Sequence, residues 1–300
     1  MPNAGDSLTL AAVSQDLLSA LLREVSRSFY LTLRILPPAI RPPISLAYLL
    51  ARASDTIADT AVVPAARRLE LLREMRAGRI QSVRELAGQQ ALPAERVLLE
   101  RLDECDRRVT ELAAADQALI RELLTTIITG QIFDLERFPG APLTAEELDR
   151  YTYLVAGCVG EFWTKMCQAH LPGLERLSVA DGIRFGKGLQ LVNILRDREK
   201  DLALGRQYVV DEAGGLAAAA EHLEAGWRYT LAIPATQKRL RLACIWPIWI
   251  GLKTLARLRL SGPGAKVSRA EVYWIMLESA LVVGNDAALD EVYERLRSGT

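Results

Sequence analysis

The sequence has few of the side chains that bind soft metals or form disulfides: two histidines and four cysteines in 300 residues. The cysteines are far apart and include no Cys-x-x-Cys pair: Cys105, Cys158, Cys167 and Cys244. No secretory leader pattern opens the chain, so we expect free, buried thiols in a cytoplasmic protein. His170 and His222 have no convincing set of further ligands nearby, which argues against a zinc site.

An excess of charge of one sign is also missing, because Lys plus Arg and Asp plus Glu each number 37. A balanced chain does not attract nucleic acid in general, so we expect no nucleic-acid partner and a locally built site for any anion. Long apolar runs are missing as well. The longest, residues 242–252, is too short to cross a bilayer, so we predict no transmembrane segment.

Apolar residues recur at helical spacing through nearly the whole chain, for example in segments 17–25, 98–112 and 120–128. No stretch alternates strictly enough to predict a strand, and the Pro- and Gly-containing breaks are too short to be interdomain linkers. We therefore predict one all-α domain over residues 1–300, with only the first few residues loose. Residues 183–195 and 243–252 are apolar on more than one face, which favours central helices in a bundle that can enclose a cavity.

Two aspartate pairs have the same spacing within predicted helices. Asp55 and Asp59 end the segment 47–59, and Asp197 and Asp201 end the segment 190–201, with Asn193 one turn before the second pair. Residues four apart project from the same helix face. Like charges at this spacing destabilise an isolated helix by roughly 0.2–0.5 kcal/mol, so we expect a cation to offset them.

Two interpretations fit these pairs. A solvated acidic face is the commoner origin of a single Asp-x-x-x-Asp in a helical protein. The context favours a binding site, because Asp55 and Asp197 follow apolar runs and are preceded by Arg52 and Arg196. Carboxylate oxygens suit Mg²⁺, and arginine binds the phosphate oxygens that Mg²⁺ bridges. The pattern therefore predicts a site that ionises a diphosphate ester.

Five separated motifs carry a resemblance to known proteins. They are SRSFY at 26–30, YLLARASDTIAD at 48–59, GQIFDL at 130–135, YTYLVAGCVG at 151–160, and the run from Gln190 to Asp201 followed by GRQY at 205–208. In this order they resemble the motifs of the squalene/phytoene synthase family, the head-to-head prenyl synthases. The resemblance implies the all-α isoprenoid synthase fold, with both aspartate pairs facing across one central cavity.

The resemblance also implies roles by position. The implied magnesium ligands are Asp55, Asp59, Asn193, Asp197 and Asp201, and the four aspartates together with Tyr151 are the implied catalytic residues. The implied substrate contacts are Ser26, Phe29, Tyr48, Arg52, Gln190, Asn193 and Arg196. Aromatic faces stabilise a nearby carbocation by about 0.5–2 kcal/mol, although core packing explains Phe29 equally well. We expect Phe29, Tyr48, Val155 and Leu189 in the cavity walls.

The chain departs from the family pattern at three positions: Ala58 where many relatives carry an acid, Gln131 where they carry methionine, and Val210 where proline is frequent. The 48–59 segment is closer to the squalene synthase form of the motif. Because we expect no C-terminal membrane anchor, the resemblance is to the soluble bacterial type. Phe162 and Trp163 favour C15 over C20 substrates. The predicted enzyme is therefore a farnesyl-diphosphate farnesyltransferase that makes presqualene diphosphate and reduces it to squalene with NADPH, in isoprenoid biosynthesis towards sterols or hopanoids.

No Gly-x-Gly-x-x-Gly follows a predicted strand, so NADPH would be held by scattered bases near the cavity mouth. The candidates are Arg27, Arg41, Lys266 and Arg269, each of which ordinary surface charge would also explain. Residues 245–250 are a candidate exposed apolar lip for peripheral membrane contact, although a buried core helix explains them better.

Several alternatives stay open. A phytoene or dehydrosqualene synthase would lose a proton without NADPH, and a hydroxysqualene-forming relative would quench the cation with water. A one-substrate terpene cyclase would not need the motifs around Ser26 and Tyr151. A catalytically inactive helical partner subunit would have no use for repelling carboxylates in an apolar cavity. The sequence does not indicate an oligomeric state.

Overall fold

The computed structural model describes residues 20–26 and 29–299, so the expectation about the first residues and the candidate Arg27 lie outside it. Every regular element of these described residues is helical and none is a strand, which confirms the all-α prediction. After a helical stretch at 20–26, the elements are α2 (Phe29–Ile35), α3 (Arg41–Asp59), α4 (Ala65–Arg76), the 3₁₀ segment η1 (Gln81–Gln89), α5 (Pro93–Glu100), α6 (Leu102–Thr110), α7 (Ala114–Arg137), α8 (Ala145–Thr152), the π-helical η2 (Tyr153–Gly157), α9 (Cys158–His170), α10 (Val179–Ala203), α11 (Glu212–Leu231), α12 (Lys238–Ser261), α13 (Arg269–Val282) and α14 (Asp286–Ser298).

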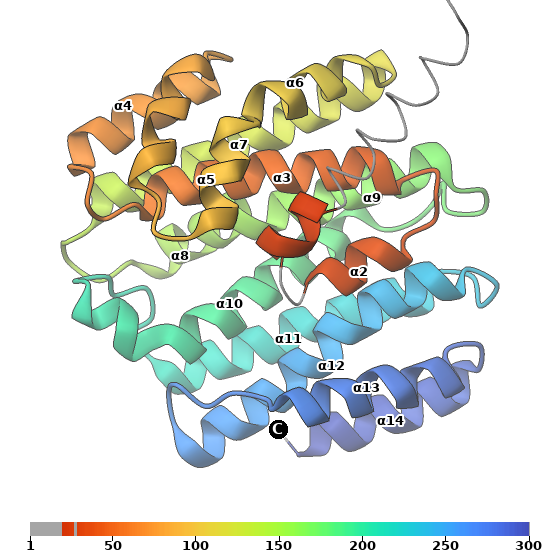
Figure 1. Cartoon of the computed structure of the whole chain (residues 1–300). Coiled ribbons are helices and arrows are strands. Elements are labelled where there is room, and N and C mark those ends of the chain that lie inside the picture. Colours follow the sequence, from red (N-terminus) through yellow and green to blue (C-terminus); the bar gives the residue numbers. More distant parts are fainter. Residues whose placement is uncertain (1–19, 27–28, 300) are drawn as a thin grey trace, which may run out of the picture.

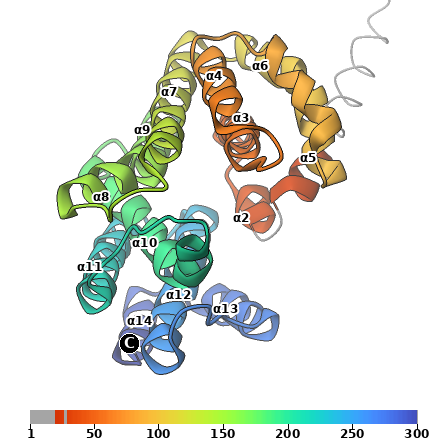
Figure 2. The same ribbon diagram turned by 90° about the vertical axis from the view of Figure 1, so that its left-hand side faces the viewer.

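The helices form two groups, α3 to α7 with α9 in one and α10 to α14 in the other, and α2 and α8 lie between them (Figures 1 and 2). One apolar core is formed mainly by the first group together with residues 229–244 of the second, and the other core mainly by the second group. Helix α12 is central, as predicted, because Ile245, Ile248 and Trp249 are fully buried and Trp246 nearly so. The interpretation of residues 245–250 as an exposed apolar lip is therefore wrong, and the alternative of a buried core helix is confirmed.

Helices α9 and α10 touch backbone to backbone. A Cβ atom at Gly160 would lie 1.9 Å from the carbonyl oxygen of Gly182, and one at Gly186 would lie 2.1 Å from that of Ala156. Only glycine leaves room for such an approach. The two helices that carry the 151–160 motif and the second aspartate pair are therefore fixed against each other without intervening side chains.

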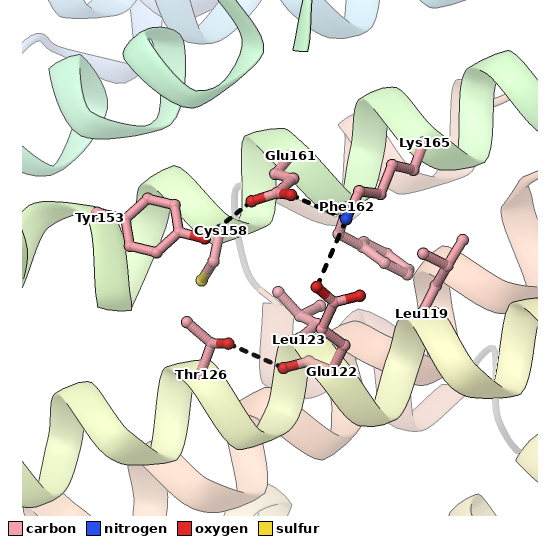
Figure 3. Close-up of a pocket in the computed structure, with 9 residues that line it drawn as sticks. All are labelled: Leu119, Glu122, Leu123, Thr126, Tyr153, Cys158, Glu161, Phe162 and Lys165. Carbon is pink, nitrogen blue, oxygen red and sulfur yellow. Dashed lines mark hydrogen bonds and ion pairs between the residues drawn. The ribbon is translucent and has the colours of Figure 1, made fainter. Parts of the chain in front are cut away.

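A π-helical turn interrupts the helix that runs from α8 into α9. On its outer side, between α7 and α9, lies a small cavity of about 20 Å³ (Figure 3). Tyr153 donates a hydrogen bond to Glu161 at 2.8 Å, and Lys165 lies 2.8 Å from Glu161 and 3.5 Å from Glu122 of α7. This polar chain ties the π turn to α7. π turns are frequent at functional sites because they shift the facing of side chains.

Candidate functional site

The first aspartate pair lies near the end of α3. Asp55 accepts a hydrogen bond from Gln131 Nε2 of α7 at 2.6 Å, and the same amide nitrogen lies 3.0 Å from Ser54 Oγ. Burial, followed by the charge of Asp59, raises the pKa of Asp55 to about 6, although Arg52 and Gln131 oppose the change. Asp59 is the exposed last residue of α3. The pair carries negative charge that its surroundings do not fully offset.

The second pair lies near the end of α10. Arg196 binds Asp197 with two hydrogen bonds, Nη2 to Oδ2 at 2.5 Å and Nε to Oδ1 at 3.1 Å. These bonds hold the pKa of Asp197 below its usual value. At Asp201, burial and then the charges of Asp197 and Asp134 raise the pKa to about 6, with Arg206 opposing. The two members of this pair therefore differ, one being neutralised and the other not.

Asp134 and Arg206 interact electrostatically with members of both pairs. Asp134 is buried on α7, and Arg206 Nε lies 3.5 Å from its Oδ2. Burial, together with the charge of Asp59, raises the pKa of Asp134, and the charge of Asp134 in turn raises that of Asp201. Arg206 also feels the charge of Asp59. One member of each pair, Asp59 and Asp201, is thus within electrostatic range of Asp134 and Arg206, which we call the acidic centre.

Aromatic rings pack against this centre. Tyr208 donates a hydrogen bond to Asp134, and its ring stacks on Tyr151 with centroids 5.0 Å apart. Phe133 lies 6.1 Å from Tyr151, and Phe138 meets the edge of Tyr208 at 5.1 Å. Burial raises the pKa of both tyrosines well above the usual value. The phenols are therefore neutral. Their aromatic rings lie beside the carboxylates, and neither tyrosine is a phenolate nucleophile.

The predicted diphosphate contacts have partners within the protein. Arg52 Nη2 lies 2.6 Å from Glu95 Oε1 of α5, and Arg196 is occupied by the aspartate that follows it. The Ser26 hydroxyl donates to the carbonyl of Leu22, one turn earlier in its own helix. Each side chain would have to exchange such a partner for a phosphate oxygen on binding.

An apolar cavity of about 200 Å³ is lined by residues of α2, η2, α9, α10, α11 and α12. Phe29 and Leu189 line it, as predicted. Gln190 and Asn193 line it as well, and Asp197 follows Asn193 by one helical turn. The cavity therefore runs along α10 towards the acidic centre.

Three side chains expected at this cavity do not line it in the described structure. Tyr48 instead stacks on Phe29, with ring centroids 5.4 Å apart, and Val155 is also absent from the wall. Phe162 faces α7 and lines the small cavity of Figure 3. The prediction that both Phe162 and Trp163 limit substrate length was thus wrong for Phe162, whereas Trp163 does line the apolar cavity.

The donor atoms at the acidic centre suit a hard divalent cation. Carboxylates and the Asn193 amide supply oxygen ligands, and Gln131 Oε1 is buried without a hydrogen-bond partner. Among the described residues, no three Asp, Glu, His or Cys side chains cluster closely enough to hold a metal ion alone. Mg²⁺ binds preferentially through one or two carboxylates plus water and substrate phosphate oxygens, so these donors fit it together with a diphosphate.

The candidate NADPH contacts differ in their exposure and in their partners within the protein. Lys266 and Arg269 are exposed, and Lys266 contributes to lowering the pKa of Asp197, after the larger effect of Arg196. The backbone N–H of Gly264 donates to the Arg196 carbonyl at 2.8 Å, which places the start of α13 beside the end of α10. Arg41 donates to the Leu36 carbonyl at 2.7 and 3.2 Å and so closes the turn before α3.

Asp134, Arg206 and Tyr208 have no role predicted from the sequence, although they lie within the motifs at 130–135 and 205–208. Their contacts join residues more than 70 positions apart in the chain. The charge of Asp134 could have indicated this contact, because an acid in the largely apolar segment 130–135 requires a partner when it is buried. The GRQY segment supplied that partner.

The fold agrees with comparisons with known proteins. The structure of TcSQS in complex with the ligand BPH1237 matches with a TM-score of 0.71 at 20% identity, over 95% of this chain and 96% of that one. A dehydrosqualene synthase crystal structure with a ligand matches with a TM-score of 0.63 at 19% identity, over 89% and 95%. These likenesses establish the all-α fold of these synthases.

The sequence gives the family. The model described as squalene/phytoene synthase matches residues 22–212, and the chain belongs to this family. The squalene synthase of Cyberlindnera jadinii is 30% identical over 200 residues, and that of Botryococcus braunii, called BSS, is 29% identical over 196. These matches cover 65% and 61% of this chain but only 45% and 39% of the relatives, so the chain spans under half their length. None of the described helices is both long and apolar enough to cross a membrane.

Proposed function

We propose that this protein is a prenyltransferase of the squalene synthase type. It joins two farnesyl diphosphates head to head through presqualene diphosphate and reduces this intermediate to squalene with NADPH. The observation that carries the proposal is the electrostatic coupling of Asp59 and Asp201, one from each aspartate pair, to Asp134 and Arg206, together with an apolar cavity that follows α10. Family membership and the squalene synthase relatives support the same reaction class.

The residues divide the work between a charged end and an apolar end. Asp55, Asp59, Asp197 and Asp201 would hold Mg²⁺, which when bound neutralises the diphosphate leaving group. The Arg206 guanidinium lies where it can bind a phosphate oxygen while remaining beside Asp134. The cavity binds the hydrocarbon chain and excludes water. Excluding water favours quenching of the carbocation by hydride transfer or proton loss over its capture by water.

The buried tyrosines stabilise the cationic intermediates. Tyr151 and Tyr208 are stacked and neutral, so they offer π faces and no phenolate that would trap a carbocation. The hydrogen bond from Tyr208 to Asp134 orients the Tyr208 hydroxyl towards the carboxylate. Tyr208 is thereby a positioning residue for Tyr151.

Purified protein incubated with farnesyl diphosphate, Mg²⁺ and NADPH should yield squalene as the main hydrocarbon in gas chromatography with mass detection. Without NADPH we expect presqualene diphosphate or a dehydrogenated hydrocarbon. The same product with and without NADPH would replace the squalene assignment by proton loss or water quenching. Release of a cyclised C15 hydrocarbon would indicate a terpene cyclase, and no turnover at all a non-catalytic subunit.

The NADPH proposal has its own variant. Reversing the charge in Arg269→Glu should raise the KM for NADPH several-fold while leaving the KM for farnesyl diphosphate nearly unchanged, because a base that contacts a cofactor phosphate forms a charge-assisted bond. Arg73→Glu, which removes an exposed base of α4, is the matched control. Equal effects of both variants would contradict a cofactor contact at Arg269.

Substrate length should depend on Trp163. Trp163→Ala removes the largest side chain that α9 contributes to the cavity wall, so we expect turnover of geranylgeranyl diphosphate relative to farnesyl diphosphate to rise about tenfold. Phe162→Ala is the control, because that ring faces α7 (Figure 3). An unchanged substrate ratio in Trp163→Ala would remove the length assignment.

A further inference from the structure

Helix α13 leaves a row of large apolar side chains in solvent. Tyr273, Trp274, Leu277 and Leu281 are 64%, 68%, 59% and 87% exposed. At 100° per residue these positions fall within one sector of the helix, and Ala280 extends the same stripe. Scattered apolar residues are ordinary on a protein surface, but a contiguous stripe on one helix indicates a binding surface.

The opposite face of α13 is firmly held, so the stripe is not a consequence of a loosely placed helix. Trp246 of α12 donates a hydrogen bond to Ser279 at 3.0 Å, and Ile275 is buried between the helices. Arg257 of α12 binds both oxygens of Glu271 at 2.7 and 2.8 Å. The helix thus presents the stripe in a fixed orientation.

The charges around the stripe favour an anionic surface as its partner. Both acids of α13 are neutralised, Glu271 as above and Glu278 by Arg295 at 2.5 Å. The exposed bases at the two ends of the helix form no salt bridge within the described residues: Lys238, Arg239, Lys266 and Arg269. Lys238 lies against Gly284, just beyond the end of α13. Apolar side chains flanked by unpaired bases match an interfacial membrane helix.

The position of α13 also relates it to the cavity. Its partner helix α12 turns Ala243, Cys244 and Pro247 towards the cavity and Trp246 towards α13. Both views place α13 on the same side of the molecule as α2, which forms another cavity wall (Figures 1 and 2). An apolar product would therefore leave close to this face.

We propose that the exposed face of α13 docks the protein onto the surface of a membrane that contains anionic lipids. Trp274 and the two leucines enter the interfacial region, and Lys238 and Arg239, beyond the end of α13, lie over lipid headgroups. The proposal does not depend on the reaction, because it concerns binding of the protein alone.

Vesicle co-sedimentation tests the proposal without substrate. The protein should bind vesicles of mixed phosphatidylglycerol and phosphatidylcholine more tightly than vesicles of phosphatidylcholine alone. Leu277→Ser with Leu281→Ser should weaken binding about tenfold, because less apolar area enters the lipid. Val62→Ser removes a residue that is 76% exposed after α3 and should bind like the unchanged protein. Lys238→Glu with Arg239→Glu should weaken binding only to the anionic vesicles.

Fluorescence gives a second readout. Trp227, Trp246 and Trp249 are buried and Trp163 lines the cavity, so a blue shift on adding vesicles reports Trp274. Trp274→Phe should abolish the shift and keep most of the binding. Failure to bind anionic vesicles, or unchanged binding of the double serine variant, overturns the proposal. Dissociation of a dimer by the double serine variant in analytical ultracentrifugation, with no vesicle binding, would instead make this face a subunit interface.

Discussion

Replacing Asp55 with asparagine should lower the rate of diphosphate release about 10³-fold while making the metal-free protein more stable. In the proposed magnesium site this carboxylate binds the cation, and asparagine keeps its volume but not its charge. It also keeps an oxygen that accepts the hydrogen bond from Gln131. Release of diphosphate in a coupled assay and circular dichroism of the variant measure the two parts. Near wild-type turnover would contradict the assignment of Asp55 to the metal site.

The stability gain follows from the raised pKa of Asp55, about 6 against 3.8. Below pH 3.8 the folded and unfolded states are both protonated, so the group has no effect. Between the two values only the folded state holds the proton, and stability falls as the pH rises. At pH 8 without metal, Asp55→Asn should therefore raise the free energy of unfolding by about 1–2 kcal/mol.

Asp197→Asn is the matched comparison. Repulsion between like charges would by itself make replacement of either aspartate stabilising, but Arg196 neutralises Asp197 and lowers its pKa. Removing this carboxylate leaves the arginine without its partner, so we expect a small loss of metal-free stability together with the same loss of turnover. Thermal unfolding in a chelator at pH 8 distinguishes the variants. A gain of equal size in both would contradict the different environments of the two pairs.

The second large effect should come from the glycine crossing. Gly160→Ala and Gly186→Ala each place a Cβ about 2 Å from a carbonyl oxygen of the facing helix, so α9 and α10 must move apart. We expect a loss of about 3 kcal/mol in the free energy of unfolding and loss of turnover, because the displacement shifts α10 and its aspartates.

Gly88→Ala is the control for these two variants. Gly88 is exposed in η1 and has no atom within 4 Å of an added Cβ, so its replacement should change stability by no more than about 0.5 kcal/mol. Urea unfolding of the three variants measures the difference. If Gly160→Ala were as stable as Gly88→Ala, the close approach of the two helices would be disproved.

Sequence periodicity was sufficient to predict the helices and the shared face of each aspartate pair, because both depend on residues a few positions apart. It could not predict contacts between residues that are far apart in the sequence and close in the folded protein. Glu95 lies 43 positions from Arg52, and the pairing of Tyr208 with Asp134 spans 74. The single-domain prediction for residues 1–300 stays a prediction.

Phe162 and Trp163 point to different sides because they are successive residues of α9, and successive residues of a helix project about 100° apart. Which of the two faces the cavity could not be counted from Tyr151, because the π turn at Tyr153–Gly157 changes the helical phase between Tyr151 and α9. The sequence YTYLVAG contains no pattern that predicts this turn. Its polar support at Glu161 and Lys165 becomes evident only when α7 is packed alongside (Figure 3).

The glycine crossing also limits how the cavity of this protein can change during evolution. Where α9 meets α10, the cavity wall consists of backbone atoms, and a substitution cannot make it smaller. Gly160, Gly182 and Gly186 all line the cavity and can only become larger. Acceptance of a longer or bulkier substrate must therefore arise in the opposite walls, at α2, at α12 or at Trp163. Directed libraries placed at those positions would sample altered specificity, whereas libraries at the glycines would mostly sample unfolded protein.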